Sequence, residues 1–286
     1  MANLKNIQTQ IKSVSSIQKV TKAMKMVAAA KLRRAQERME KARPYSERLE
    51  NLIGNLLIDV DASILPLLET RDDIQKHALL IITSDRGLAG SFNSNIIKKA
   101  EEEIAKVGKN NAVLICIGKK CYEYFNSRNY QIDYSYSETW NDLNYNQAIK
   151  IGNGLVSSYL ENKFDSLSVI YNYFKNTASQ EVLYNQLLPI AFENNDEIKL
   201  NDIIYEPSKK ELIQSLVPKF FNTEIWQCLL ESFASEQAAR MLAMENATEN
   251  AKDMISDLKL QFNKARQTAI TTEMLEIVGG AEALSN

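Results

Sequence analysis

Residues 219–278 read KFFNTEIWQCLLESFASEQAARMLAMENATENAKDMISDLKLQFNKARQTAITTEMLEIV and contain neither Gly nor Pro. Mostly apolar or small side chains recur there at intervals of three and four, at Leu230, Phe233, Gln237, Met241, Met244, Ala247, Ala251, Met254, Leu258, Phe262, Ala265 and Ala269. The mean step of about 3.5 residues is the period of a coiled-coil seam, the line of side chains that faces a partner helix. We predict a helix over 222–277, about 84 Å long at 1.5 Å per residue, with its stop at Gly279 and Gly280. A helix of this length must extend beyond a small domain and contact another structure.

Residues 1–43 form a second stretch without Gly or Pro, and they show a similar seam. Its positions step by three and four, with three successive steps of three from Ile11 to Val20, at Leu4, Ile7, Ile11, Val14, Ile17, Val20, Met24 and Val27. Such a shift is a stammer, which overwinds a coiled coil. Pro44 is expected to kink or interrupt the helix, which then resumes to about residue 57. For stripes of half this length, an ordinary helical core would be the favoured interpretation.

Charge is unevenly distributed at the N-terminal end. Residues 1–43 carry eleven Lys or Arg and only two acids, Glu37 and Glu40, although the whole chain has a net charge of −2. The basic side chains form either a solvated face or a surface for an acidic partner. Nucleic acid is disfavoured as that partner, because residues 1–43 contain no aromatic side chain that would stack on bases.

The middle of the chain alternates strands with helices. Short apolar runs such as HALLIITS at 77–84 and AVLICIG at 112–118 are typical of buried strands. Further strands are predicted at 132–136, 167–174 and 181–188, and helices at 95–107, 119–126 and 145–161. This alternation predicts a doubly wound, mostly parallel α/β domain.

The composition agrees with a helix-rich chain, because nine Gly and five Pro are too few for the many turns of an all-β protein. We divide the chain into an N-terminal helix at 1–57, an α/β domain at 74–206 and a C-terminal helix at 209–286. The fold class is therefore α/β with long terminal helices.

The strand at 77–84 runs into TSDRGLAGSFN at 83–93, a Gly-containing loop before a helix. A strand, such a loop and a helix can together bind phosphate. The pattern is neither GxGxxG nor GxxxxGK[ST], and no Lys follows the second glycine, so a Walker motif is excluded. The preferred interpretation is a tight connection in which Gly87 and Gly90 adopt backbone angles that other residues resist and Asp85 caps the turn.

No set of residues assembles a nucleophile, a base and an orienting side chain. His77 is the single histidine and opens an apolar strand, which is typical of a structural residue. Cys116, Cys121 and Cys228 show neither a zinc spacing nor a disulfide framework, and they suit a reducing compartment. We therefore expect no catalytic residue, no cofactor and no metal. We also expect no signal peptide and no membrane-spanning helix.

Four sequence blocks resemble a known family. They are IQKVTKAMKMVAAAKLRRAQ at 17–36, TSDRGLAGSFN at 83–93, ASEQAARMLAMENATENA at 234–251 and NKARQTAITTEMLEIVGGAEAL at 263–284. In content and order they are similar to the gamma subunits of bacterial F-type ATP synthases, and the resemblance covers essentially the whole chain. The family usually has Cys and Gly where this chain has Ala89 and Ser91. Because no Cys-containing insertion of the chloroplast type is evident, thiol-based control is not expected.

The resemblance implies a central-stalk rotor subunit whose terminal helices form an antiparallel, left-handed coiled coil inside a ring of alpha and beta subunits. The α/β domain would lie at the base, against the epsilon subunit and the membrane rotor ring. Proton flow would turn the stalk and drive ATP synthesis in the beta subunits, so this chain would be non-catalytic. It would associate peripherally with the cytoplasmic face of the bacterial inner membrane and bind no nucleic acid.

Matching the family's motifs residue by residue implies a set of partner contacts. They are Lys22, Met24 and Lys25 on the first helix, Arg240, Arg266, Gln267, Thr271 and Glu273 on the last, and Tyr205 and Glu206 in a Tyr-Glu-Pro segment that would face the membrane ring. Two other classes stay open as alternatives. One is a free-standing coiled-coil adaptor with an α/β binding module, and the other is a nucleotide-binding enzyme that uses the 83–93 loop.

Overall fold

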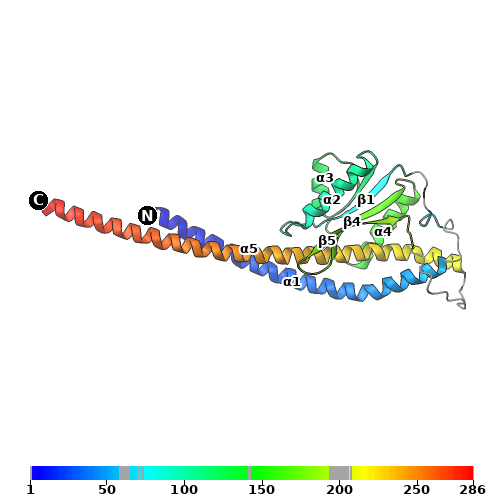
Figure 1. The fold of residues 1–286 in the computed structure, drawn as a ribbon, viewed down its shortest axis with the longest axis horizontal. Helices are drawn as coiled ribbons and strands as arrows, with labels where there is room; N and C mark the ends of the chain where they lie inside the picture. Colours follow the sequence, from blue (N-terminus) through cyan, green and yellow to red (C-terminus); the bar gives the residue numbers. More distant parts are fainter. Residues whose placement is uncertain are drawn as a thin grey trace. The chain divides into compact units, whose positions relative to one another are not determined.

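The computed structural model describes residues 2–57, 65–69, 71, 74–140, 143–192, 206 and 208–285. The elements in chain order are α1 (Ala2–Leu57), β1 (His77–Ile82), α2 (Phe92–Val107), β2 (Ala112–Ile117), α3 (Lys119–Ser127), β3 (Ile132–Tyr136), α4 (Tyr145–Leu160), β4 (Ser166–Phe174), β5 (Gln180–Leu188) and α5 (Lys209–Ser285) (Figure 1). The long terminal helices are confirmed, although α5 is longer at both ends than the helix predicted over 222–277. Each predicted strand and helix of the middle region is confirmed, with bounds that differ by a few residues.

The chain forms two compact units. The helix-pair unit comprises residues 1–28 and 241–286, and the α/β unit comprises residues 29–240. Each terminal helix therefore belongs partly to one unit and partly to the other. The division into three segments drawn from the sequence follows the chain rather than these units, and it stays a prediction.

In the helix-pair unit, α1 and α5 run antiparallel. Thr21 Oγ1 lies 2.8 Å from Thr248 Oγ1, and Lys25 Nζ lies 2.6 Å from Glu245 Oε1. The residue number on α5 falls as the number on α1 rises, so the two helices have opposite directions. The antiparallel helix pair implied by the resemblance is confirmed.

The α1 seam continues without a stammer. After Val14, buried and half-buried side chains follow in alternate steps of four and three at Gln18, Thr21, Lys25 and Ala28. The predicted seam residues Ile17, Val20, Met24 and Val27 are instead 54%, 53%, 41% and 56% exposed. The prediction was wrong because it ranked positions by hydrophobicity alone. The unbroken heptad places the bonded Thr21 and the small Ala28 against α5, and small side chains allow two helices to approach closely.

The predicted α5 seam is largely confirmed in this unit. Met244 and Ala251 are buried, and partly buried side chains follow at Leu258, Phe262, Ala265 and Ala269. Met254 is 54% exposed, however, and the partly buried Ile255 takes its place. From Ala251 onward, a seam through Ile255 alternates steps of four and three as far as Ala269. A seam through Met254 would instead contain two successive steps of four, from Met254 to Leu258 and from Leu258 to Phe262.

Both long helices continue past residues that usually end helices. α1 includes Pro44, and α5 includes Pro218, Gly279 and Gly280. Of the two effects predicted at Pro44, the interruption is wrong and the kink stays a prediction, and the predicted stop at the glycine pair is wrong. A helical Pro costs about 3 kcal/mol and a helical Gly about 1 kcal/mol relative to Ala. After Pro44 this cost is offset by the burial of the next turns, since each fully buried Leu or Ile contributes about 1.5–3 kcal/mol. The buried side chains there are Leu49, Ile53 and Leu56.

The α/β unit is built on a five-stranded sheet in the order β3-β2-β1-β4-β5. β1 pairs in parallel with β2 and with β4, and β2 pairs in parallel with β3. β5 is antiparallel to β4. Because the strand order reverses between β1 and β4, the sheet is doubly wound and mostly parallel, as predicted.

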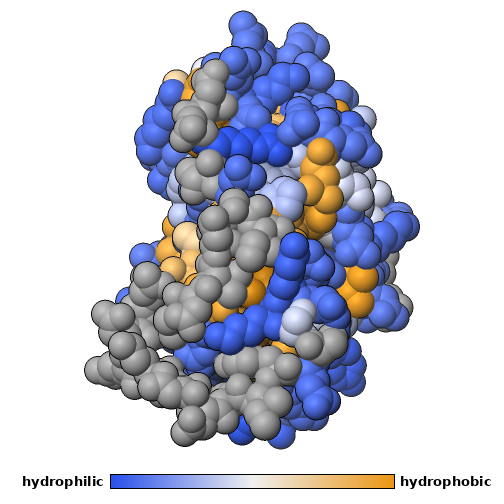
Figure 2. Space-filling model, turned by 90° about the vertical axis from the view of Figure 1, so that its right-hand side faces the viewer, coloured by the Kyte–Doolittle hydropathy of each residue, from blue (hydrophilic) through white to orange (hydrophobic). Residues whose placement is uncertain are grey.

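Helices cover both faces of this sheet. Leu79 and Ile81 pack with α2 and α3, whereas Leu80 and Ile82 pack with α4 and with parts of α1 and α5. Burial on both faces explains why the parallel strands are continuous apolar runs in the sequence. On the face turned to the viewer in Figure 2, hydrophilic side chains predominate and hydrophobic ones form small patches. Across the described ranges, no helix combines the length and the hydropathy that a bilayer crossing requires.

Candidate partner-contact surfaces

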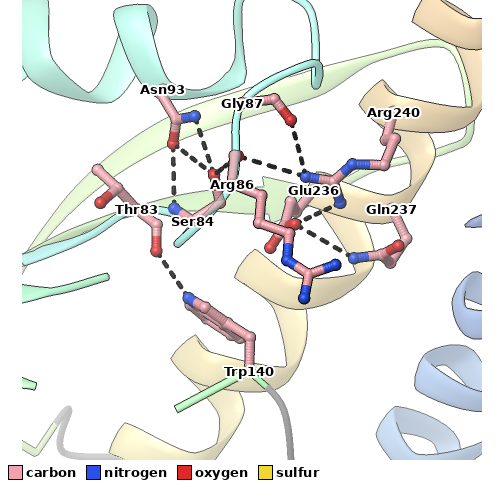
Figure 3. A network of polar contacts seen from close by, with 9 residues as sticks. All are labelled: Thr83, Ser84, Arg86, Gly87, Asn93, Trp140, Glu236, Gln237 and Arg240. Atoms are coloured by element: carbon pink, nitrogen blue, oxygen red, sulfur yellow. Dashed lines mark hydrogen bonds and ion pairs between the residues drawn. The ribbon is translucent and has the colours of Figure 1, made fainter. Parts of the chain in front are cut away.

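The crevice at the carboxyl ends of β1 and β4 is where doubly wound sheets usually bind ligands. In this protein, α5 packs there. The guanidinium of Arg240 donates through Nη2 to the carbonyl oxygens of Arg86 and Gly87, at 3.4 and 3.2 Å (Figure 3). Ser235 Oγ donates to the carbonyl oxygen of Asn172 in β4 at 3.1 Å. The chain's own helix therefore takes the position that a ligand has in related architectures.

The loop after β1 is held by its own polar groups. The Ser84 N–H donates to Asn93 Oδ1 at 3.0 Å, and the Trp140 indole donates to the carbonyl oxygen of Thr83 at 2.9 Å (Figure 3). Asp85 Oδ1 accepts from the Lys119 N–H at 3.0 Å, so Asp85 stabilises the start of α3 and not the turn that was predicted for it. These bonds, together with the packing of α5, argue against phosphate binding by this loop.

Positive backbone φ angles in this loop occur at Leu88 (63°) and Gly90 (57°). The expectation is confirmed for Gly90 and wrong for Gly87, because Leu88 and not Gly87 has the other positive φ angle. Leu88 adopts the left-handed region, which is sterically unfavourable for a residue with a Cβ atom, and it is 68% exposed. Its side chain therefore contributes no core packing to the α/β unit.

Arg240 is engaged within its own chain. It forms an ion pair with Glu236 one turn earlier on α5, and Gln237 Nε2 also donates to Glu236 Oε1 at 3.3 Å (Figure 3). Glu236 is 4% exposed, and this burial raises the pKa of its carboxyl, while Arg240 and Lys31 oppose the rise. The Arg240 side chain is only 15% exposed, so its predicted partner contact is restricted to a small surface.

The helix-pair unit exposes a line of apolar side chains on α1. This outer stripe consists of Ile17, Val20, Met24 and Val27, each at least two-fifths exposed. Lys22 is exposed on another side of α1, whereas Lys25 is half-buried in its ion pair with Glu245. Sequence reasoning assigned the apolar residues to the seam and so missed the stripe. The sequence did contain a pattern that predicts the stripe: a regular heptad seam continues from Val14 through Gln18 and Thr21, and this leaves Ile17 and Val20 outside the seam.

The stretch of α5 from residue 266 to residue 278 is largely exposed. Arg266, Gln267, Thr271 and Glu273 are all exposed, and the Thr271 hydroxyl donates to the Gln267 carbonyl at 2.9 Å. Large apolar side chains lie among them, which sequence reasoning did not single out, at Ile270, Met274, Leu275, Ile277 and Val278. Within the helix-pair unit, these residues form a mixed polar and apolar surface that we name the α5 tip.

The predicted foot contacts are only partly described. Glu206 is exposed, and Tyr205 lies outside the described residues. The structure therefore places Lys22, Met24, Arg266, Gln267, Thr271, Glu273 and Glu206 on exposed surface. Their contacts with partners stay predictions.

His77 has a structural environment. Its Nδ1 lies against Ser166 Oγ, and its Nε2 is 3.0 Å from the Tyr184 hydroxyl. Burial lowers the pKa of His77, which keeps the ring neutral near neutral pH. Among the residues that the structure describes, no group of three or more His, Cys, Asp or Glu side chains is arranged to hold a metal ion.

A groove of about 270 Å³ lies between α1 and α5 within the α/β unit. Four carboxylates and one guanidinium line it, with Glu47, Glu50 and Arg43 on α1 and Glu224 and Glu231 on α5. Burial raises the pKa of Glu231 to about 7, partly opposed by Arg43. Burial and the neighbouring Glu50 also raise the pKa of Glu224, although a hydrogen bond from Ser46 at 3.4 Å opposes this.

These raised pKa values predict a stability change with pH. The folded chain takes up a proton at Glu231 near pH 7, while the unfolded chain, with an ordinary pKa of 4.5, stays ionised there. Between about pH 4.5 and pH 7 the folded state therefore binds more protons than the unfolded state, and stability falls as the pH rises through about 7. We expect the thermal midpoint to be higher at about pH 6 than at about pH 8. Glu231→Gln should lose much of this difference, whereas Glu249→Gln, at an exposed position of α5, should keep it. If the native chain and both variants showed the same pH dependence of the thermal midpoint, Glu231 would not be the group responsible.

Comparison with known proteins identifies the family. A family model described as ATP synthase matches residues 3–284. The ATP synthase gamma chain of Prosthecochloris aestuarii is 47% identical over 291 residues, covering 99% of both chains. That of Chlorobium limicola is 46% identical over 291 residues, covering 100% of both.

Solved structures show the same fold. A chain in the central stalk and c-ring of the Tetrahymena thermophila mitochondrial ATP synthase is 26% identical, with a TM-score of 0.63, and the match covers 80% of this chain and 99% of that one. A chain in the OSCP, F1 and c-ring assembly of the Euglena gracilis enzyme has a TM-score of 0.71 at 19% identity, covering 99% and 95%. The fold is therefore that of central-stalk subunits of ATP synthases. The chain belongs to the family of gamma subunits of F-type ATP synthases.

Proposed function

We propose that this chain is the rotor shaft that transmits torque between a proton-driven membrane ring and a catalytic ring of alpha and beta subunits. In this role it couples proton flow to ATP synthesis and carries out no chemistry itself. The observation that carries the proposal is the helix-pair unit, whose seam is closed between α1 and α5 while its outer surface exposes apolar side chains.

The outer stripe and the α5 tip support contacts with alpha and beta subunits. Complete burial of a fully exposed large apolar side chain contributes about 1.5–3 kcal/mol, and these partly buried side chains would gain roughly half of that when a partner covers them. Lys22 and Lys25 favour an acidic partner surface, and contacts of this kind depend less on close geometry than apolar packing does. A rotating surface needs attraction of this kind without permanent capture. Met24 on α1, and Arg266, Gln267, Thr271 and Glu273 on α5, are the contact residues that we propose for this part.

The α/β unit is the part that we propose to contact the epsilon subunit and the membrane ring, with Tyr205 and Glu206 toward the ring. Arg240 belongs to this unit and has a contact role next to the loop after β1. The chain associates with the cytoplasmic face of the membrane through the complex, and nucleic acid is not a partner.

The same proposal includes the statement that this chain neither binds nor hydrolyses ATP. The crevice at the sheet's carboxyl edge is packed by α5, and the loop after β1 holds its own polar groups. ATP turnover then belongs to the other subunits of the complex. A nucleotide-binding enzyme would need these same groups for its substrate.

The test removes the outer stripe. In Ile17→Ser/Val20→Ser/Val27→Ser, the seam residues are unchanged, so circular dichroism should show a normal helix content. We expect assembly with alpha and beta subunits to weaken at least about tenfold, because several buried apolar contacts are lost. The measurement is co-purification with the ring, together with ATP turnover by the isolated native chain, which should be absent.

The matched control places Ser at exposed polar positions of the same helix, Asn6, Gln8 and Gln10. It should assemble like the native chain. Normal assembly by the stripe variant would remove the support for an enclosed shaft and favour a free-standing adaptor. ATP turnover by the isolated chain, abolished by a substitution within it, would contradict its non-catalytic role.

A further inference from the structure

Two of the three cysteines lie in contact inside the α/β unit. Cys116 is in β2 and Cys121 is in the first turn of α3, and their Sγ atoms are 2.7 Å apart. Both side chains are fully buried, on the sheet face covered by α2 and α3. Cys228 belongs to the core on the opposite face of the sheet. A disulfide between Cys116 and Cys121 requires the sulfurs to approach by only about 0.7 Å.

We propose that Cys116 and Cys121 form a redox site, a dithiol that a small disulfide such as glutathione disulfide oxidises to an intramolecular disulfide. The spacing of Cys116 and Cys121 in the chain is not that of a C-x-x-C redox motif, so sequence analysis did not predict this pair. The proposal does not depend on the rotor function and concerns a modification of the α/β unit alone.

The reaction has two exchange steps. The thiolate of one cysteine attacks a sulfur of the small disulfide, which breaks its S–S bond and releases one small thiol. The thiolate of the other cysteine then attacks the cysteine sulfur of the mixed disulfide, forms the Cys116–Cys121 bond and releases the second small thiol. Two cysteine thiols are oxidised, one small disulfide is reduced, and the two thiol protons pass to the two released thiols.

The local backbone fixes the pair in this arrangement. Gly118, between β2 and α3, has a φ of 94°, and a Cβ atom there would lie 2.2 Å from the carbonyl oxygen of Thr83. The Cys121 N–H donates to Thr83 Oγ1 at 2.9 Å, and Asp85 caps the same helix start. Because these bonds position α3 whatever the state of the sulfurs, the folded chain holds the two thiols at high effective concentration.

The same environment makes the oxidation slow. Burial and the neighbouring Cys116 raise the pKa of the Cys121 thiol well above its ordinary value, and the thiolate is the reacting form. The small disulfide therefore reacts only when α3 opens. The site responds to sustained oxidation rather than to a brief exposure.

The experiment equilibrates the full chain in glutathione buffers of increasing disulfide content, with urea kept below the unfolding transition so that α3 opens repeatedly. Trypsin cleaves after Lys119 and Lys120, between the two cysteines, so the oxidised chain should yield residues 110–119 linked to residues 121–128. Reduction should separate these peptides. Free thiols should fall from three to one, and half-oxidation should need at least about tenfold less glutathione disulfide than in the fully unfolded chain.

The matched variants separate the pair from the third cysteine. Cys228→Ser should fall from two thiols to none, and Cys121→Ser should keep both of its thiols. The peptide map of the native chain decides the question even where a variant folds poorly. Three thiols remaining at equilibrium, single glutathione adducts, or a link to Cys228 would each overturn the proposal.

Discussion

Ala251→Pro is expected to abolish assembly with alpha and beta subunits while the α/β unit stays folded. Ala251 is 7% exposed in the α5 seam of the helix-pair unit. Pro there removes one backbone hydrogen bond and clashes with the preceding turn, at a cost of about 3 kcal/mol or more. The α/β unit should survive, because both of its core clusters are formed by residues between 29 and 240.

The helices of this protein already contain Pro44 and Pro218, so the position of a proline decides its effect. Both lie in the α/β unit, where fully buried side chains such as Ile53 and Val217 hold the neighbouring turns. Around Ala251 the flanking residues Asn250 and Lys252 are exposed, and less apolar surface is available to offset the cost.

Circular dichroism and co-purification with the ring measure this result. The strand signal should be retained while assembly, or rotation after assembly, is lost. Ala251→Ser keeps the helix hydrogen bond and serves as the control, which should assemble normally. A proline variant that assembles and supports ATP synthesis at the native rate would show that this segment is not a stiff, enclosed shaft.

The strands were predictable because burial on both sheet faces leaves a strong mark. His77–Ile82 and Ala112–Ile117 consist almost entirely of apolar residues, and no helix of that length forms alone. The long helices were predictable because the heptad period persists over many turns. Their ends were not, because the cost of Gly279 and Gly280 is small against the rest of a long helix.

The register of the α1 seam was not predictable from hydrophobicity. Thr21 lies in the seam because Thr248 bonds it, and Val20 is exposed although it is more apolar. The heptad continuing through Gln18 was the better guide.

The packing of α5 into the crevice was also beyond sequence reasoning. Arg240 and Gly87 are 153 residues apart in the chain, and no local pattern connects them. The same holds for the groove that Glu231 shares with Arg43. Contacts of this kind depend on how the elements pack. The family motifs singled out only the polar residues of the α5 tip, Arg266, Gln267, Thr271 and Glu273.

Rotation of this chain against a fixed catalytic ring tests the central proposal most directly. A probe attached through Asn110→Cys, at an exposed turn between α2 and β2, would report the α/β unit while the alpha and beta subunits are held on a surface. The native cysteines are buried, which favours labelling at the introduced one. With ATP we expect continuous rotation in one direction, and none with a non-hydrolysable analogue. Hydrolysis of ATP at the full rate while the probe stays still would contradict the proposal that this chain is the rotor.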